Sequence, residues 1–216
     1  MLFRSGHGAD AAIPSIEDIF NDVTAPGLAA QPNYLHHTIF AEMDNRDHPG
    51  KPTSGGYYRA SFGTWDDQTL QQYNFRRFDA EAIRFLPVRT GHVVALRGGA
   101  SYVNNADDQR VPFYVFPYIG GADTVRGYRE FRFRDENVVF FNGEYRWDAL
   151  KHLEVAPFFD MGKVASDWQD VNLSDMRTAD GLGLRLHADS RGFFRIDVGM
   201  GGGEGRNYFL KFGPSF

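Results

Sequence analysis

The sequence contains no cysteine. Without thiols, the chain can form neither a disulfide framework nor a cysteine-bound zinc or iron–sulfur centre. It also lacks any apolar run approaching the roughly 18 to 20 residues of a membrane-spanning helix, which excludes a helical membrane protein. No run of Lys and Arg is present and the formal net charge is -5. The composition therefore argues against a nucleic-acid partner.

The apolar core of a signal peptide is also missing from residues 1–14, MLFRSGHGADAAIP. A protein exported to the outer membrane needs such a signal. If the chain is exported, we therefore expect either that it is numbered from a processed or engineered start, or that it is a fragment of a longer protein.

Aromatic rings and glycine are abundant. Aromatic residues make up 15% of the chain, with 20 Phe and 10 Tyr, and there are 24 Gly. Only 42% of the residues are apolar, and the mean hydropathy is -0.43. So many rings in a polar chain are typical of a barrel that shows rings to lipid and keeps polar groups inside. The alternative, on composition alone, is an aromatic-rich soluble sandwich.

A pattern of period two dominates from Tyr34 onward, interrupted by clusters of Gly, Asn, Asp and Pro. Nine segments follow it: 34–46, 54–66, 71–86, 92–104, 137–149, 153–166, 179–189, 192–202 and 207–216. In the last three, apolar side chains share one face and Arg, Asp, His or Gly share the other. The side chains that we predict to face lipid are Leu182, Leu184, Leu186, Phe194, Ile196, Val198, Leu210 and Phe212.

The length of the segments favours a membrane barrel over a soluble sheet. Segments such as 54–66, 138–150 and 153–165 reach or exceed the roughly 9 to 11 residues of a tilted transmembrane strand, whereas soluble strands usually have about 5 or 6. We therefore predict an all-β fold: an antiparallel transmembrane β-barrel over 34–216, preceded by an N-terminal segment, 1–33, with a short helix. Bacterial single-chain barrels have even strand numbers, so we expect about eight strands, with two paired half-barrels as the alternative.

A connection of roughly 30 residues separates the fourth and fifth of these segments, far longer than the usual 4 to 6. Its aromatic and basic residues are unlike a disordered linker. Motifs begin here and continue into the next two strands and the last one. They are Val125, Arg126, Gly127 and Tyr128 in the connection; Glu144, Tyr145 and Arg146 in the next strand; Phe159, Asp160, Met161 and Gly162 in the following one; and Phe212 and Phe216 at the C-terminus.

These motifs, in this order, resemble the signature region of the superfamily of BamA, TamA and two-partner-secretion transporters, also called bacterial surface antigens. The resemblance covers about residues 34–216. It implies a barrel in the bacterial outer membrane, a long extracellular loop folded back into its lumen, and a recognition signal at Phe212 and Phe216. Members usually carry POTRA domains ahead of a sixteen-stranded barrel; here no POTRA pattern is visible and about half of the strands are present.

Arg126 is the first candidate functional residue. A guanidinium inside a barrel must be paired, and its planar fork suits a carboxylate. The resemblance implies Asp160 as its partner with Glu144 second, and Gly162 and Arg146 beside the loop. We expect Gly127 to permit a tight turn or a close approach to the wall, and Tyr128 to pack under the loop tip. The alternative is an exposed arginine without a partner.

No catalytic, metal or cofactor site is predicted. Glu144 could be a general acid or base, but structural pairing with Arg146 is the simpler interpretation, since both lie on one strand face. His36 and His37 point to opposite faces and cannot chelate together. Gly-x-Ser-x-Gly is absent, so we expect a protein that is not an enzyme.

The leading functional hypothesis is a membrane scaffold that helps insert or transport proteins at the outer membrane. Its partners would be outer-membrane lipids and unfolded outer-membrane or secreted proteins, with a homo-oligomer as a further option and no nucleic acid. The second hypothesis is a structural barrel or small pore without insertase activity. The third is a soluble all-β binding domain, which detergent dependence would separate from the first two.

Overall fold

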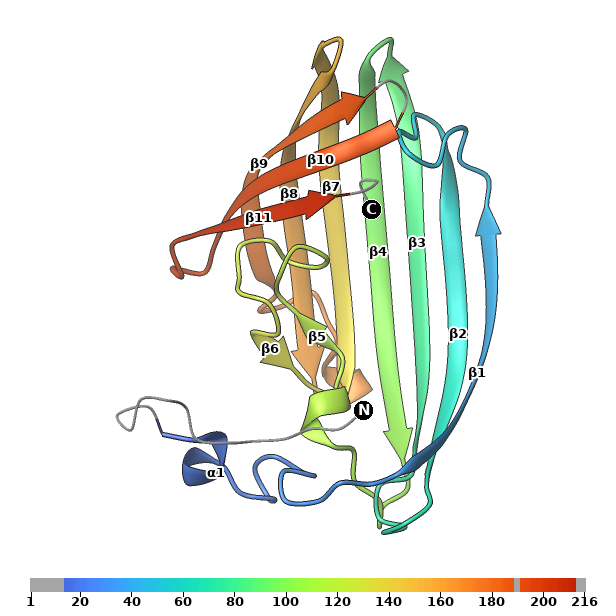
Figure 1. Cartoon of the computed structure of the whole chain (residues 1–216), viewed down its shortest axis with the longest axis vertical. Helices are drawn as coiled ribbons and strands as arrows, with labels where there is room; N and C mark the ends of the chain where they lie inside the picture. The colour runs from blue at the N-terminus through green and yellow to red at the C-terminus, as the bar shows by residue number, and fades with distance from the viewer. Residues whose placement is uncertain (1–13, 189–190, 213–216) are drawn as a thin grey trace.

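The computed structural model describes residues 14–188 and 191–212. Nine strands form one sheet, in which each strand pairs antiparallel with its neighbour (Figure 1). They are β1 (Tyr34–Asp44), β2 (Gly55–Asp67), β3 (Phe75–Arg89), β4 (His92–Asn105), β7 (Asn137–Leu150), β8 (Leu153–Ala165), β9 (Arg177–Ala188), β10 (Arg191–Gly201) and β11 (Arg206–Phe212). The remaining elements are α1 (Ile16–Ile19), η1 (Phe113–Val115), η2 (Trp168–Asp170), and the strand pair β5 (Tyr118–Ile119) and β6 (Phe133–Arg134). In the part of the chain described, no helix combines the length and hydropathy needed to cross a membrane.

Each of the nine predicted segments overlaps a strand of the main sheet, and their two faces separate as the alternation requires. Residues 189 and 213–216 of the predicted segments lie outside the described residues. Leu182 and Leu186 are each 47% exposed on the convex face, whereas Arg185 between them is 2% exposed on the concave face. This arrangement is the inverse of a soluble sheet, in which the leucines would be buried. The convex face therefore has the character of a lipid-facing surface.

Aromatic side chains mark two levels on this convex face. At one level the ring of His92 stacks on that of Trp147, with the ring centroids 6.1 Å apart. At the other level the ring of Tyr102 contacts that of Trp168 edge-on, with the centroids 5.7 Å apart. Positions 92 and 102 lie on the same strand, ten residues apart. At roughly 3.3 Å per residue and a tilt of about 40°, the two levels are about 25 Å apart, the height of the apolar band of an outer-membrane barrel.

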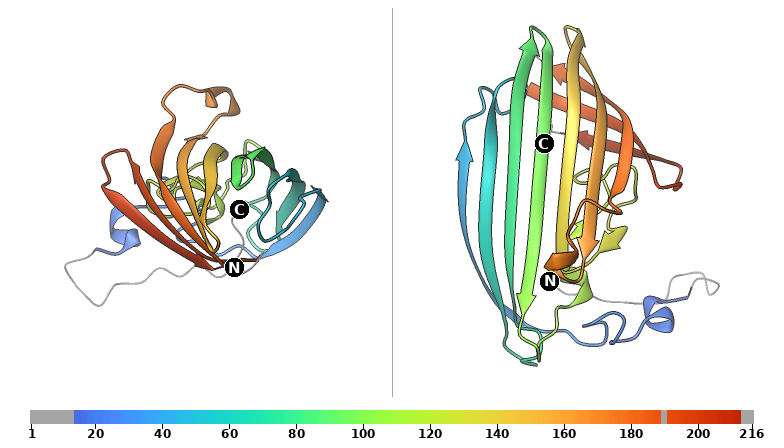
Figure 2. Two further views of the ribbon diagram at one scale, coloured as in Figure 1. Left: turned by 90° about the horizontal axis from the view of Figure 1, so that it is seen from above. Right: turned by 180° about the vertical axis from the view of Figure 1, so that it is seen from behind.

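The expected closed barrel of about eight strands is wrong in count and in closure. The main sheet has nine strands, and it curls into an open trough (Figure 2). Within the described residues β1 does not pair with β11. The reason is directional: eight successive antiparallel pairings leave β1 and β11 running the same way. To close the barrel with antiparallel pairing, an odd number of further strands would be needed between β1 and β11. In two copies related by a twofold axis along the trough, β1 of one copy would lie parallel to β11 of the other.

The segment before β1 lies against the base of the long connection. The predicted helix forms one turn, α1, and the amide of Ser15 donates to Asp18 Oδ2 at 2.8 Å. Asp22 then forms an ion pair with Arg110 at 2.7 Å. The amide of Phe113 donates to the carbonyl of Pro26 at 2.9 Å. The long connection is thereby held at the end of the trough where β4 ends.

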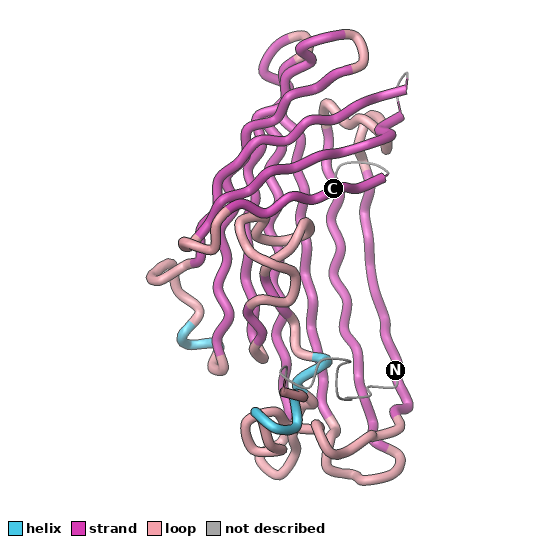
Figure 3. The backbone as a smooth tube through the Cα atoms, turned by 60° about the vertical axis from the view of Figure 1, so that its left-hand side comes forward, coloured by secondary structure: helices cyan, strands magenta, loops and turns pink. Residues whose placement is uncertain are grey.

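From this end the connection turns into the trough on the concave side of the strands (Figure 3), where β5 contacts β7 and β8. The short pair β5–β6 gives it internal order, with Tyr118 opposite Arg134 and Ile119 opposite Phe133. The predicted loop inside the lumen is therefore present, although the lumen is that of an open sheet.

Candidate functional site

The tip of the connection, residues 120–129, is closed by its own hydrogen bonds. Gly120 and Gly121 have φ of 109° and 92°, in the range that favours glycine. A Cβ on Gly120 would lie 2.3 Å from the carbonyl oxygen of Arg129. The Thr124 hydroxyl accepts from the amide of Gly120 at 2.8 Å, and the amide of Gly121 donates to the carbonyl of Tyr128 at 3.0 Å. The result is a compact tip that presents Arg126 to the strand wall.

Arg126 is 1% exposed and pairs with carboxylates of three strands. Its Nη1 lies 3.5 Å from Asp197 in β10, and Arg126 forms hydrogen bonds with the other two carboxylates. Its Nε and Nη2 donate to the two oxygens of Asp160 in β8, each at 2.7 Å. Its Nη1 donates to Glu144 in β7 at 2.5 Å, and its backbone amide donates to Asp160 at 3.1 Å. The guanidinium also lies over the ring of Phe158, 3.5 Å from the centroid. The predicted pairing with Asp160 is thus bidentate, and Glu144 is a simultaneous second partner.

This contact is the centre of a larger buried cluster with four arginines and four carboxylates, each no more than 5% exposed. Glu144 accepts from Arg146 at 2.9 Å and from Arg185 at 2.7 Å, while Arg195 pairs with Asp197 at 2.9 Å. Arginine stays charged in proteins, so ionised carboxylates make the cluster neutral. The members are Arg126, Glu144, Arg146, Glu154, Asp160, Arg185, Arg195 and Asp197.

Glycines bring the backbone of the tip against strand β10. A Cβ on Gly127 would lie 2.5 Å from the Cβ of Ala179 and 2.7 Å from the amide nitrogen of Gly201. A Cβ on Gly199 would lie 2.2 Å from the carbonyl oxygen of Arg126. The predicted close approach of Gly127 to the wall is therefore present. Glycines of the wall, which have no side chain in the way, permit the same approach from the other side.

Apolar contacts complete the seat of the tip. Val125 is fully buried and Tyr128 is 3% exposed, in one cluster with Ile119, Val138 and Ala179. A Cβ on Gly162 would lie 3.0 Å from Cγ2 of Val125. Of the predicted loop partners, Asp160 and Glu144 contact Arg126 directly, Gly162 contacts Val125, and Arg146 acts one step away through Glu144.

Several anchors of the tip were not predicted from the sequence. Asn207 of β11 donates to the carbonyl of Gly127 at 2.8 Å, and Arg195 of β10 donates to the carbonyl of Ala122 at 3.2 Å. Asp123 pairs with Lys211 of β11, and its carbonyl accepts from Arg97 of β4. The period-two alternation of the strands indicates that these polar side chains point inward, and this was the signal available in the sequence. Alternation does not specify the partner of a side chain.

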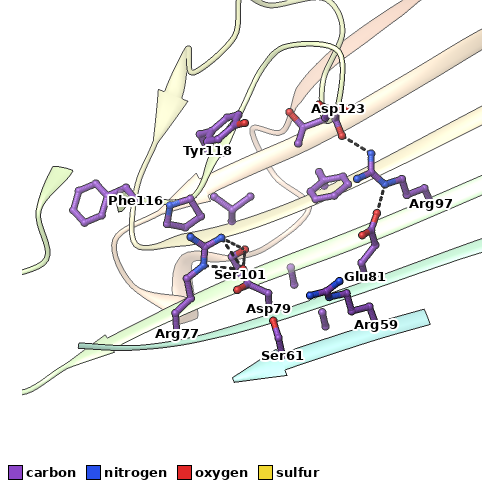
Figure 4. A pocket seen from close by; sticks show the side chains of 16 residues that line it. Arg59, Ser61, Arg77, Asp79, Glu81, Arg97, Ser101, Phe116, Tyr118 and Asp123 are labelled. Atoms are coloured by element: carbon purple, nitrogen blue, oxygen red, sulfur yellow. Dashed lines mark hydrogen bonds and ion pairs between the residues drawn. The ribbon is translucent and has the colours of Figure 1, made fainter. Parts of the chain in front are cut away.

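A second polar wall, on β2 to β4, faces the connection from the other side. Arg77 pairs with Asp79 at 2.7 Å, and Arg97 pairs with Glu81 at 2.5 Å. Figure 4 shows these pairs across from Tyr118 and Asp123 of the connection. A cleft of about 360 Å³ lies between the two, and the hydrogen bond from Arg97 to the carbonyl of Asp123 bridges it. This cleft is partly open to solvent, and both acidic and basic side chains line it.

The C-terminal signal is described only in part. Phe212 is 77% exposed on the convex face and its ring lies 5.1 Å from that of Phe194. Phe216 lies outside the described residues.

A curved antiparallel sheet with an apolar convex face, a buried neutral charge cluster on the concave face and a loop fixed against it defines the wall of an outer-membrane β-barrel. The family model of the Omp85 superfamily domain matches residues 36–213. The chain therefore belongs to the Omp85 superfamily, as the motifs predicted, and to the bacterial outer membrane.

Two relatives bear on the fold and its extent. The chain is 30% identical over 187 residues to the outer membrane protein assembly factor BamA of Nitratidesulfovibrio vulgaris, with 76% of this chain and 22% of that protein covered. The crystal structure of BamA from Haemophilus ducreyi lacking POTRA domains 1–3 superimposes with a TM-score of 0.68 at 14% identity, over 84% of this chain and 42% of that one. The chain thus spans about a fifth of the curated relative, and its fold resembles part of the BamA barrel.

Proposed function

We propose that the chain acts as a membrane-embedded scaffold that helps insert or transport proteins at the outer membrane. The observation that carries this proposal is the docked tip, which bonds to strands from β4 to β11. It holds the terminal strands β9 to β11 to the rest of the wall through the buried charges as well as through strand pairing. A fixed, exposed strand edge can template the pairing of an incoming strand.

The partners in this proposal are outer-membrane lipids on the convex face and unfolded outer-membrane or secreted proteins at the strand edge. Residues 34–216 would form the working domain, and within the N-terminal segment 1–33 the described residues 14–33 would secure the base of the connection. Strand pairing itself makes and breaks no covalent bond, and Glu144 and Asp160 are paired with Arg126 and shielded from solvent. The proposed function is therefore that of a scaffold without catalytic activity.

A reconstituted insertion assay tests the proposal. The chain is placed in phosphatidylcholine vesicles, a urea-denatured outer-membrane barrel protein is added, and its folding is followed by heat-modifiable mobility on gels. We expect faster folding than in empty vesicles, and loss of the gain with Arg126→Gln. Arg76→Gln, an exposed neighbour of the inward Arg77, is the matched control. A folding rate equal to that of empty vesicles would refute the insertion role.

The cleft between the connection and the β2–β4 wall favours a second candidate, a structural barrel or small pore. Its charges of both signs and its volume of about 360 Å³ suit water and small ions. Conductance in planar bilayers without any gain in the insertion assay would favour this alternative.

A further inference from the structure

A cavity distinct from the charge cluster lies where the N-terminal segment, the base of the connection and the end of the β2–β3 wall meet. Its volume is about 970 Å³, at the upper end of the range for small-molecule sites. The walls are mostly aromatic and include Phe20, Trp65, Phe75, Phe116 and Phe131. Arg77, Phe116 and Tyr118 also line the cleft drawn in Figure 4, so the two spaces are neighbours.

Two arginines line the cavity, and they differ in their partners. Arg77 is satisfied by Asp79 at 2.7 Å and by Ser101 at 3.3 Å. Arg134 has its guanidinium 4.6 Å from the ring centroid of Phe131. Among the described residues, no carboxylate lies within ion-pair distance of Arg134. The cavity therefore has one cation without a counter-ion.

The surroundings of Arg134 raise the free energy of its charged form. The residue is half-buried in the loop pair β5–β6. Burial lowers the pKa of Arg134 below its ordinary value, and Tyr118 opposes this shift. A charge that is partly removed from water and unpaired gains more from an incoming anion than one already in an ion pair. The flat rings beside it offer stacking surfaces for an apolar body.

We propose that this cavity binds an aromatic anion, with a flat apolar body between the rings of Trp65, Phe116 and Phe131 and one carboxylate or sulfonate at Arg134. The charge of the site selects the anion, and the rings select the body. This site is independent of the insertion role, since it uses none of the residues that hold Arg126.

A matched pair of probes tests the charge selectivity. 1-Naphthoate and 1-naphthamide share one ring system and differ in charge. The chain has three tryptophans, and Trp147 and Trp168 are 47% and 45% exposed on the convex face. Replacing these two with Phe leaves Trp65, in the cavity wall, as the reporter. We expect saturable quenching of Trp65 in detergent micelles, with naphthoate binding about tenfold tighter than naphthamide, because hydrogen bonds to charged groups contribute about that much.

Variants separate the cavity from the rest of the surface. Arg134→Gln should remove most of the tenfold preference for naphthoate while changing naphthamide binding less than about twofold, so that naphthamide also reports an intact cavity. Arg76→Gln, on the opposite face of β3, should leave both affinities unchanged. Equal affinities for the two probes in the parent protein, an unchanged preference in Arg134→Gln, or quenching that does not saturate would each overturn the proposal.

Discussion

Removing the charge of Asp160 should destabilise the protein more than removing both partners of its ion pair. Asp160 is fully buried and accepts three hydrogen bonds from Arg126. In Asp160→Asn, the neutral cluster gains a net positive charge in a site without solvent. Breaking one partner of a buried pair costs about 3 to 5 kcal/mol, and Arg126→Gln, which leaves Asp160 uncompensated, should cost a similar amount.

The double variant should be more stable than either single variant. Glu144 keeps Arg146 and Arg185 when Arg126 is gone, and Asp197 keeps Arg195. The double variant therefore restores the neutrality of the cluster and leaves no buried charge without a partner. The double variant should lose less free energy of unfolding than either single variant loses. The coupling free energy between the two sites should therefore be at least about 3 kcal/mol.

The assay is urea unfolding in lipid vesicles, followed by tryptophan fluorescence and gel mobility. The matched control is the pair Arg77 and Asp79, at the same 2.7 Å but with side chains 27% and 36% exposed; its coupling should stay below about 1 kcal/mol. Additive costs for Arg126 and Asp160, or equal coupling in both pairs, would refute the reasoning that burial and charge balance hold the loop.

Two further predictions concern the faces of the sheet. Spin labels on Leu184→Cys and Ile196→Cys should be accessible to lipid-soluble quenchers and shielded from aqueous ones, since both side chains share the convex face; the reverse pattern would contradict the membrane assignment. Gly199→Ala should destabilise by about 1 to 3 kcal/mol, because its Cβ would meet the Arg126 carbonyl oxygen at 2.2 Å, whereas Gly143→Ala, whose nearest neighbours lie at 3.8 Å, should be nearly neutral. Equal losses in the unfolding assay would show that the close contact with the loop is not the cause.

The strands and their faces could be predicted because period two is a local property. Leu182 and Arg185 need only their own backbone to point to opposite sides. The strand count of the barrel could not be settled this way, since closure depends on how β1 and β11 are directed after eight pairings. The order of neighbours is set by long-range hydrogen bonds, and these leave no mark in the spacing of any one segment.

The sequence by itself determined an all-β outer-membrane chain, the family motif in the long connection, and Arg126 as a residue in need of a carboxylate. Only the tertiary structure decided that Glu144 serves three arginines from the loop, β7 and β9, and that Asn207 of the last strand holds the carbonyl of Gly127. The reason is physical: parity tells which side chains enter the lumen, but the curvature of the sheet and the path of the loop decide which of them come within bonding distance.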